Sequence, residues 1–413
     1  MHSSFLKPRY PSHCFSALPA AVRHLLTGLG PLGLAKKLFG GLPTRYDTVL
    51  LFFVDAFGWR FFEQYADDYP FLKRFVKDGV VSKITSQFPS TTAAHVTTIH
   101  TGLPIGQSGV FEWQYYEPQV DALIAPLLFS FAGTRERDTL RPARIAPASL
   151  YPARTLYRDL QRLGVTSHIF QSREYTPSTF SDIVFQGANV VPYKTIPEAF
   201  VNLGQALEKR LTPAYFFLYF DKIDALMHDY GPASPQAAAE IDGFLTNLER
   251  LFFKPTLRKL KRTLFIFTAD HGQMEVSPQT TIYLNQRPEF AGVERFLKTN
   301  ARGELLVPAG SPRDLFLYVH ADLLDEARHF FAQRLAGRAD VCQTQTLIAR
   351  GFFGPQPVSP QFLARVGNLV ILPYESESVW WYEPGKFEMK FLGHHGGLTK
   401  QEMEIPLLLY TND

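Results

Sequence analysis

TLFIFTADHGQ, residues 263–273, is the stretch that decides the fold of this chain. It begins with a run of apolar and β-branched residues, which is typical of a strand buried on both faces of a sheet. Strands of that kind lie in parallel sheets, and such sheets bind ligands at the edge where the strands end. We therefore predict a doubly wound α/β fold in which Asp270 and His271 lie at the ligand-binding edge.

Carboxylates and histidines accompany three other apolar runs as well. They are Asp55 after residues 48–54, Asp224 and His228 after residues 215–220, and His394 and His395 before residues 405–410. Taken alone, Asp270 and His271 are better explained as a structural hydrogen-bonded pair. Their recurrence with the other runs favours metal ligands, because a doubly wound sheet gathers its strand ends in one crevice.

Composition and charge place the chain among ordinary globular proteins. It has 413 residues, of which 46% are hydrophobic and 20% charged, and a formal net charge of +3. This length predicts one large α/β domain with an insertion, or two domains. The small net charge and the lack of a dense basic cluster argue against a nucleic-acid duplex as a partner.

The two cysteines and the N-terminal region bear on the cellular location. Cys14 and Cys342 lie far apart and beside no ligand motif, so we expect neither a disulfide framework nor a thiolate metal site. The first forty residues hold only short apolar pieces, which fit neither a signal peptide nor a membrane span. The sequence therefore predicts a cytoplasmic protein without a transmembrane segment and leaves the oligomeric state open.

The pattern of expected elements divides the chain into three parts. Residues 1–44 are predicted to be an N-terminal extension, residues 45–275 with 391–413 the metal-binding catalytic α/β domain, and residues 276–390 an inserted cap. The cap has its own strand and helix patterns, so we expect a small α+β unit. Residues 109–157 show no period and are expected to form a long excursion over the sheet edge.

Three hydroxyl residues, Ser90, Thr91 and Thr92, precede an expected helix. Hydroxyls at a helix start are ordinarily N-caps, because they satisfy free backbone N–H groups. The same place meets the positive end of the helix dipole, which suits a nucleophile in phosphoryl transfer. Both roles can coexist on neighbouring residues. His95 and His100 follow in the same helix and are expected to be structural.

Six short motifs stand along the chain. They are VDAFG (54–58), PSTT (89–92), TGLP (101–104), DALMH (224–228), TADHG (268–272) and HGG (395–397). Their order resembles the alkaline phosphatase superfamily, and within it the type I phosphodiesterase/nucleotide pyrophosphatase branch. The resemblance covers residues 48–410 and implies an alkaline-phosphatase-like doubly wound, mostly parallel sheet, flanked by helices and carrying a small inserted α+β cap.

The resemblance also implies two divalent metal ions, usually zinc, with manganese as the alternative. One ion would be held by Asp55, Asp270 and His271, and the other by Asp224, His228 and His395. His395 is preferred to His394 because the family's ligand directly precedes Gly-Gly. The first ion would also touch the nucleophile. The family's Pro-x-x-Thr pattern selects Thr92 for that role, with Thr91 as the rival.

The implied activity is hydrolysis of a phosphoric ester or phosphoanhydride through a threonine nucleophile, with a small-molecule phosphate ester or a nucleotide as substrate. Alternatives within the superfamily are a phosphonate hydrolase and a phosphomonoesterase or phosphomutase. An alternative of another class is an inactive homologue that only binds metal or ligand. It is disfavoured because all six implied ligands and a hydroxyl are present.

Candidate substrate contacts are fewer and rest on weaker signals. Where the nucleotide pyrophosphatases carry a phosphoryl-binding asparagine, this chain has Trp113, with the amide of Gln114 beside it. Arg313 and Lys390 are basic residues of the cap region, which is inserted between two ligand motifs. We expect them to be the first basic residues to test as contacts to an anionic substrate.

Overall fold

The computed structural model describes residues 1–412 and is built around a seven-stranded sheet with the order β2-β17-β9-β1-β8-β6-β7. The strands are β1 (Thr48–Val54), β2 (Val80–Thr85), β6 (Thr166–Ser172), β7 (Asn189–Tyr193), β8 (Ala214–Phe220), β9 (Thr263–Thr268) and β17 (Glu404–Tyr410). β17 is antiparallel to β2 and β9, and β9, β1, β8, β6 and β7 run parallel. The predicted doubly wound, mostly parallel sheet is confirmed.

The three central strands place their ends level with one another. β1, β8 and β9 are buried at every position, as their apolar runs predict. Val54 pairs with Phe220, and Phe53 pairs with Thr268. The residues that follow these strands therefore leave the sheet at one edge. Because β17 runs in the opposite direction, the residues before it arrive at the same edge.

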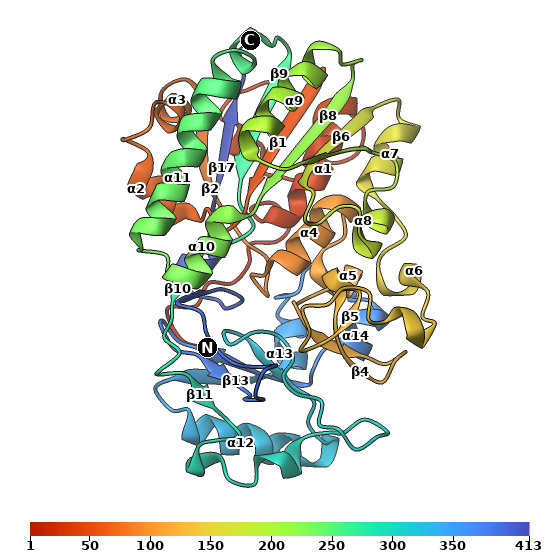
Figure 1. Ribbon diagram of the computed structural model, residues 1–413, viewed down its shortest axis with the longest axis vertical. Coiled ribbons are helices and arrows are strands. Elements are labelled where there is room, and N and C mark those ends of the chain that lie inside the picture. Colours follow the sequence, from red (N-terminus) through yellow and green to blue (C-terminus); the bar gives the residue numbers. More distant parts are fainter. Residues whose placement is uncertain (413) are drawn as a thin grey trace.

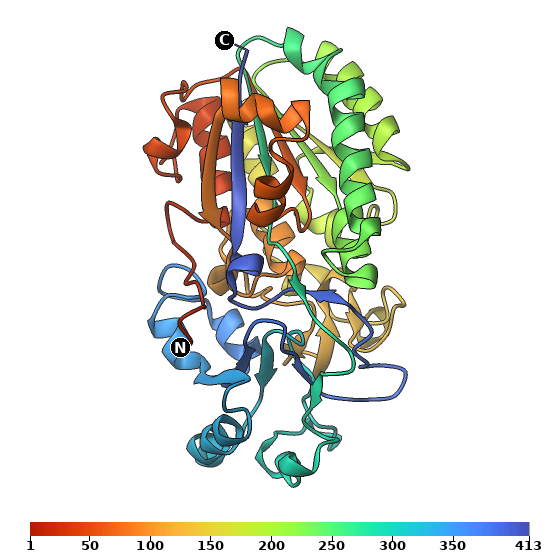
Figure 2. The same ribbon diagram turned by 90° about the vertical axis from the view of Figure 1, so that its left-hand side faces the viewer.

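Helices cover both faces of the sheet, as Figure 2 shows for α1 on one side and α11 on the other. One layer contains α1 (Leu18–Thr27), α4 (Thr92–Thr101), α7 (Leu156–Arg162) and α8 (Thr179–Val184). The other contains α9 (Ile196–Glu208), α10 (Lys222–Tyr230), α11 (Pro235–Asn247) and a π-helical turn (Leu248–Phe253). α2 (Trp59–Tyr65) and α3 (Pro70–Asp78) pack against β17.

The N-terminal residues contribute to the main core, although the sequence predicted an extension. Phe15, Leu18, Val22 and Leu25 are fully buried in the same apolar cluster as the central strands. The ring of Phe15 packs at 4.8 Å from the ring of His95 in α4. The N-terminal segment is thus packed against the helix that begins at Thr92.

The excursion at residues 109–157 contains regular structure that the sequence did not reveal. β3 (Tyr115–Glu117), β4 (Ala122–Ala125) and β5 (Ser130–Phe131) form a small antiparallel sheet, flanked by α5 (Ile105–Ser108) and α6 (Pro147–Leu150). These strands have two to four residues. Runs so short cannot display a two-residue period.

The cap lies below the sheet in Figure 1, with α12 at the far end of the molecule. Its strands are β11 (Ile282–Tyr283), β12 (Leu315–Leu317), β13 (Ala339–Gln343), β14 (Leu369–Pro373) and β15 (Val379–Trp380), and its helices are α12 (Leu324–Arg334), α13 (Thr344–Ala349) and α14 (Pro360–Arg365). Residues from β11, β12, β14 and α12 form a second apolar cluster. That cluster gives the cap a core of its own.

Short elements complete the chain. β10 (Met274–Glu275) pairs with β16 (Gly393–His394), and α15 (Lys400–Met403) precedes β17. The 3₁₀ turns are Phe15–Ala17, Lys36–Phe39, Pro126–Leu128, Arg141–Ala143, Leu257–Lys259, Pro288–Phe290, Val293–Phe296 and Ala321–Leu323. Within residues 1–412, every helix is too short or too polar to cross a bilayer.

Candidate metal centre

Four elements bring the predicted ligands to one edge of the sheet. Asp55 directly follows β1, and Asp270 and His271 follow β9. Asp224 and His228 are four residues apart in α10, so they share one face of that helix. His395 lies in the connection from β16 to β17, where the reversed direction of β17 returns the chain to this edge.

The first group of ligands is buried. Potential ligand atoms of Asp55, Asp270 and His271 all lie within 4.8 Å of one another. His271 Nε2 is 3.2 Å from Asp270 Oδ2 and 3.6 Å from Asp55 Oδ1. The side chains of Asp270 and His271 are fully buried. These three residues are the ones predicted for the first ion.

The second group lies beside the first and is more open. Asp224 Oδ2 is 3.3 Å from His228 Nε2, and Asp224 Oδ1 is 3.8 Å from His395 Nε2. Asp224 and His228 each keep 15% of the side chain exposed. His271 also lies within 4.8 Å of Asp224 and His395, and its ring stacks on that of His395 at 3.7 Å. The structure therefore gathers all six predicted ligands, with His271 between the two groups.

Backbone carbonyls orient the three histidines. His228 Nδ1 lies 2.7 Å from Gly393 O, His271 Nδ1 3.0 Å from Gly272 O, and His395 Nδ1 2.9 Å from Ser90 O. A carbonyl can only accept, so each Nδ1 carries the proton and donates it. Each Nε2 is then left with a free lone pair that faces the carboxylates. This is the arrangement of metal-ligating histidines.

The carboxylates of the first group lack a counter-charge. Burial, and after it the charge of Asp270, raise the pKa of Asp55 well above its usual value. Burial also raises the pKa of Asp270. For Asp224, burial raises the pKa, but the adjacent His228 and His395 outweigh it and the pKa is lowered. Oδ2 of Asp270 is buried without a hydrogen-bond partner in residues 1–412. Divalent cations fit this set of carboxylate and imidazole donors.

The three neighbouring hydroxyls point to different partners. Thr92 is the first residue of α4, and its Oγ1 lies 3.1 Å from His271 Nε2 and 3.4 Å from both carboxylate oxygens of Asp55. Thr91 is the N-cap residue, yet its side chain makes no capping bond to the described helix. Ser90 Oγ donates to Gly397 O at 2.8 Å. Thr92 is thus the hydroxyl that meets the ligand cluster.

Two residues that support the ligands were not predicted. The Tyr219 hydroxyl donates a short hydrogen bond to Asp55 Oδ2. Gln273 Nε2 donates to the carboxylate of Asp224 and, at 3.1 Å, to its backbone carbonyl. Tyr219 is the sixth residue of the apolar strand β8, where a tyrosine is indistinguishable from core packing in the sequence. Gln273 directly follows the Asp-His-Gly motif, and that adjacency was the available signal.

The prediction that Arg313 contacts substrate is wrong. Its side chain is fully buried, and its Nε and Nη2 donate to Glu402 Oε1 at 3.0 Å and Oε2 at 2.9 Å. Nη1 donates to Tyr374 O at 2.7 Å. The sequence showed a basic residue in the region above the metals but could not show the buried acid 89 positions away that pairs with it. Lys390, by contrast, is 70% exposed and pairs with Glu388.

The other candidate side chains lie in different environments. Trp113 is 46% exposed. Gln114 is buried, and its amide donates to Pro308 O in the cap at 3.3 Å. His95 Nδ1 contacts Thr91 O at 2.8 Å, and His100 Nδ1 contacts the Tyr157 hydroxyl at 2.6 Å. Both histidines are buried in α4, as expected for a structural role.

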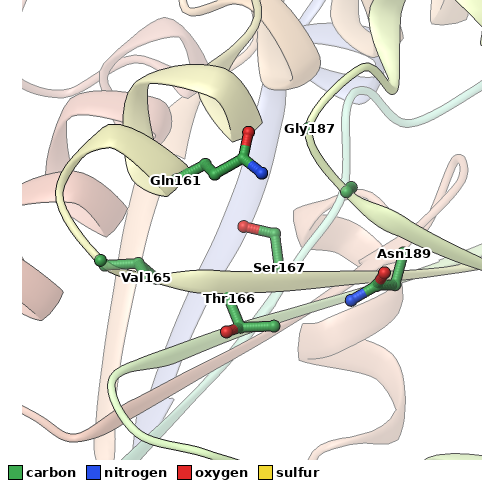
Figure 3. A pocket seen from close by; sticks show the side chains of 8 residues that line it. Gln161, Val165, Thr166, Ser167, Gly187 and Asn189 are labelled. Atoms are coloured by element: carbon green, nitrogen blue, oxygen red, sulfur yellow. The ribbon is translucent and has the colours of Figure 1, made fainter.

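A separate cavity opens at the opposite edge of the sheet. It has a volume of about 390 Å³ and lies at the amino ends of β6 and β7, between residues 161–167 and 187–189. Figure 3 shows the side chains of Gln161, Ser167 and Asn189 around it. Because the ligands gather where the strands end, this cavity belongs to another part of the molecule.

Comparisons with known proteins agree with this geometry. Residues 49–397 match the family described as type I phosphodiesterase/nucleotide pyrophosphatase. The human ectonucleotide pyrophosphatase/phosphodiesterase family member 1 is 24% identical over 253 residues, which are 59% of this chain and 26% of that protein. The chain thus spans about a quarter of the length of this relative.

Solved structures share the fold. Murine ectonucleotide pyrophosphatase/phosphodiesterase 5, in an inactive form bound to AMP, superposes with a TM-score of 0.63 at 18% identity, covering 89% of this chain and 88% of that one. Phosphonoacetate hydrolase from Sinorhizobium meliloti 1021, bound to phosphonoacetate, superposes with a TM-score of 0.60 at 17% identity, covering 88% and 91%. The two neighbours carry different small phosphorus compounds on a shared architecture.

Proposed function

The chain belongs to the type I phosphodiesterase/nucleotide pyrophosphatase family, and on that basis we propose that it hydrolyses a phosphodiester or phosphoanhydride bond of a small molecule or nucleotide. Thr92 is the nucleophile of this proposal. Two divalent ions occupy the centre, one at Asp55, Asp270 and His271 and one at Asp224, His228 and His395. The position of Thr92 Oγ1, 3.1 Å from His271 Nε2 and 3.4 Å from Asp55, is the observation that carries the proposal.

The chain's own groups divide the work of an in-line displacement. Divalent cations at this centre supply Lewis-acid stabilisation of an alkoxide and of charge on a phosphoryl group. The Asp55 carboxylate accepts the hydrogen bond of the Thr92 hydroxyl and is the nearest base to its proton. Free backbone N–H groups at the start of α4 face the phosphoryl oxygens. Attack by Thr92 Oγ1 on phosphorus expels the alcohol or phosphate and leaves a phosphothreonine for water to hydrolyse.

Further parts of the proposal concern the metal, the substrate and the location. Zinc is the proposed metal because imidazole and carboxylate ligands suit it, with manganese as the alternative. A small phosphate ester or nucleotide is the proposed substrate, since AMP is bound by a neighbour of the same fold. Trp113, half exposed, is the proposed contact to the substrate's leaving group. The cytoplasm is the proposed compartment.

A substrate survey tests the reaction class. The zinc-loaded chain is assayed with bis-p-nitrophenyl phosphate, p-nitrophenyl phosphate, a dinucleotide and phosphonoacetate. Turnover of the diesters is expected. Turnover of the monoester alone, or of phosphonoacetate alone, would replace the proposal by a phosphomonoesterase or a phosphonate hydrolase. No turnover with two bound ions would favour an inactive binding homologue.

The nucleophile is tested by removing single hydroxyls. Thr92→Ala is expected to lower turnover at least about a thousandfold while keeping bound metal and thermal stability, because the hydroxyl contributes covalent chemistry. Thr91→Ala is the matched control and should retain most activity. Acid trapping and peptide mapping should place phosphate on Thr92. Phosphate mapped to Thr91 or Ser90 would contradict the assignment.

A further inference from the structure

A second pair of buried carboxyl groups lies next to the metal centre. Glu112 precedes Trp113 in the excursion, and Asp314 precedes strand β12 of the cap. Both side chains are completely buried. The proposed mechanism uses neither of them, and neither belongs to the two ligand groups described above.

Each carboxyl group has one satisfied oxygen and one that is unpartnered. Oε2 of Glu112 accepts the N–H of Trp113, and Oδ1 of Asp314 accepts the N–H of Ser311 at 3.0 Å. Oε1 of Glu112 and Oδ2 of Asp314 are buried and receive no hydrogen bond from any of residues 1–412. Leaving buried, charged oxygens without a partner is costly, so a ligand is expected there.

The two groups sense each other, and no basic side chain neutralises them. Burial, and after it the charge of Glu112, raise the pKa of Asp314, and burial raises the pKa of Glu112 to about 8. The neighbouring Arg313 is committed to Glu402. In the described part of the chain no hydrogen bond joins the two carboxyl groups, so a proton shared between them does not account for the geometry.

The proposed zinc centre shows the same combination of features. There too a carboxylate oxygen, Asp270 Oδ2, is buried and unpartnered, and burial raises the pKa of the acid. At Glu112 and Asp314, however, no histidine accompanies the carboxylates. The hydroxyls of Thr91 and Ser311 adjoin them instead. Oxygen donors alone suit a hard cation, and Mg²⁺ is commonly held through one or two carboxylates.

We propose that Glu112 and Asp314 bind a third divalent cation, Mg²⁺, through Oε1 and Oδ2. The site joins the two turns that carry the proposed nucleophile and the ligand His395. Thr91, the neighbour of Thr92, hydrogen-bonds to Glu112. Ser311 Oγ lies 3.1 Å from the carbonyl oxygen of His395. A Cβ placed on Gly396 would lie 2.7 Å from Asp314 Oδ1, so this carboxylate is packed directly against the backbone after His395.

Metal content and Mg²⁺ binding test this site without using catalysis. The full chain is loaded with zinc, freed of excess metal, and titrated with Mg²⁺ by calorimetry, with metal content measured by mass spectrometry. One Mg²⁺ per chain is expected beside two zinc ions. Glu112→Gln and Asp314→Asn should each weaken Mg²⁺ binding at least tenfold and leave the zinc content unchanged.

The control and the overturning results are distinct. Asp221→Asn removes another buried carboxylate, whose partners are Tyr175 and Lys222, and should leave Mg²⁺ binding unchanged. Added Mg²⁺ should raise the Tm of the wild type but not of the Glu112 and Asp314 variants. If the zinc-loaded wild type takes up no Mg²⁺ at millimolar concentration, the site does not exist, even if the variants fail to fold. Uptake of Mg²⁺ without any hydrolysis would defeat the proposed function and retain this site.

Discussion

At the scale of single residues, neighbours in sequence differ sharply in what they contact. Thr92 meets Asp55 and His271, whereas Thr91 faces Glu112 and Ser90 donates to Gly397. The sequence motif selected Thr92 only through a family resemblance. The structure places its hydroxyl among the ligands because the helix begins there and turns successive side chains in different directions.

Tyr219 offers a test of how ligand orientation affects metal affinity. Its hydroxyl donates to Asp55, so Tyr219→Phe leaves one ligand less constrained. Losing a hydrogen bond of this kind costs about 10–100-fold in metal affinity or activity. We expect zinc affinity at the Asp55 site to fall by that factor, measured by competition with a chromophoric chelator.

Tyr175 provides the control for that change. Its ring lies 6.4 Å from that of Tyr219, and its hydroxyl donates to Asp221, which is no predicted ligand, at 2.6 Å. Tyr175→Phe should therefore leave zinc affinity unchanged. Equal losses in both variants would show that the ring environment, and not the bond to Asp55, sets the affinity.

At the scale of elements, α4 combines a reactive start with a buried, proton-sensitive middle. His100 is 1% exposed, and burial lowers its pKa to about 3 from an ordinary value near 6.5. The unfolded chain therefore binds a proton that the folded chain refuses. Stability from this group is complete above pH 6.5 and is lost as the pH falls below it.

The resulting pH dependence can be measured on the metal-free chain. From pH 6.5 to 5 the His100 contribution should remove about 2 kcal/mol of unfolding free energy. Urea unfolding at several pH values should show a shallower slope for His100→Asn, although the lost bond to Tyr157 lowers its stability at every pH. An unchanged slope would mean that His100 is protonated in the folded state.

How well an element could be predicted depended on its length and burial. The strands β1, β8 and β9 were evident because apolar runs of six or seven residues, bounded by polar ones, are typical of central strands. The small sheet β3–β5 was not, since its strands have at most four residues. Helix α10 was also not predicted as a helix, although the four-residue spacing of Asp224 and His228 was a signal for it.

At the scale of the whole molecule, the cap and the catalytic domain are joined by the buried pair Arg313 and Glu402. Glu402 also accepts the N–H of Gly397 at 3.0 Å, so the pair adjoins the turn that carries His395. Removing Arg313 leaves a buried carboxylate unpaired. We expect Arg313→Ala to lower the unfolding free energy by about 3–5 kcal/mol, measured by urea denaturation.

Lys390 is the natural comparison for that variant. It is exposed, so Lys390→Ala should change stability by less than about 0.5 kcal/mol. Replacing both members of the buried pair with apolar residues should recover part of the loss, because no unpaired charge then remains. A stable Arg313→Ala variant with altered substrate affinity would restore the role that the sequence had suggested.

Sequence reasoning was strongest where one strand's end decides the outcome and weakest where distant segments meet. Asp55 and Asp270 could be predicted to lie together because parallel strands end at the same edge. The pairing of Arg313 with Glu402, and of Gln114 with Pro308, depends on how the cap packs on the sheet. Local periodicity and composition contain no information about such contacts.

The antiparallel placement of β17 affects the order of events during protein synthesis. β17 fills the slot between β2 and β9, and His395 lies just before it, so the ribosome must translate nearly the whole chain before this slot and the second group of ligands can be completed. Asp55, Asp224 and Asp270 emerge long before that point. A nascent chain thus exposes its carboxylates early but completes the centre only at the end, which delays activity until translation finishes.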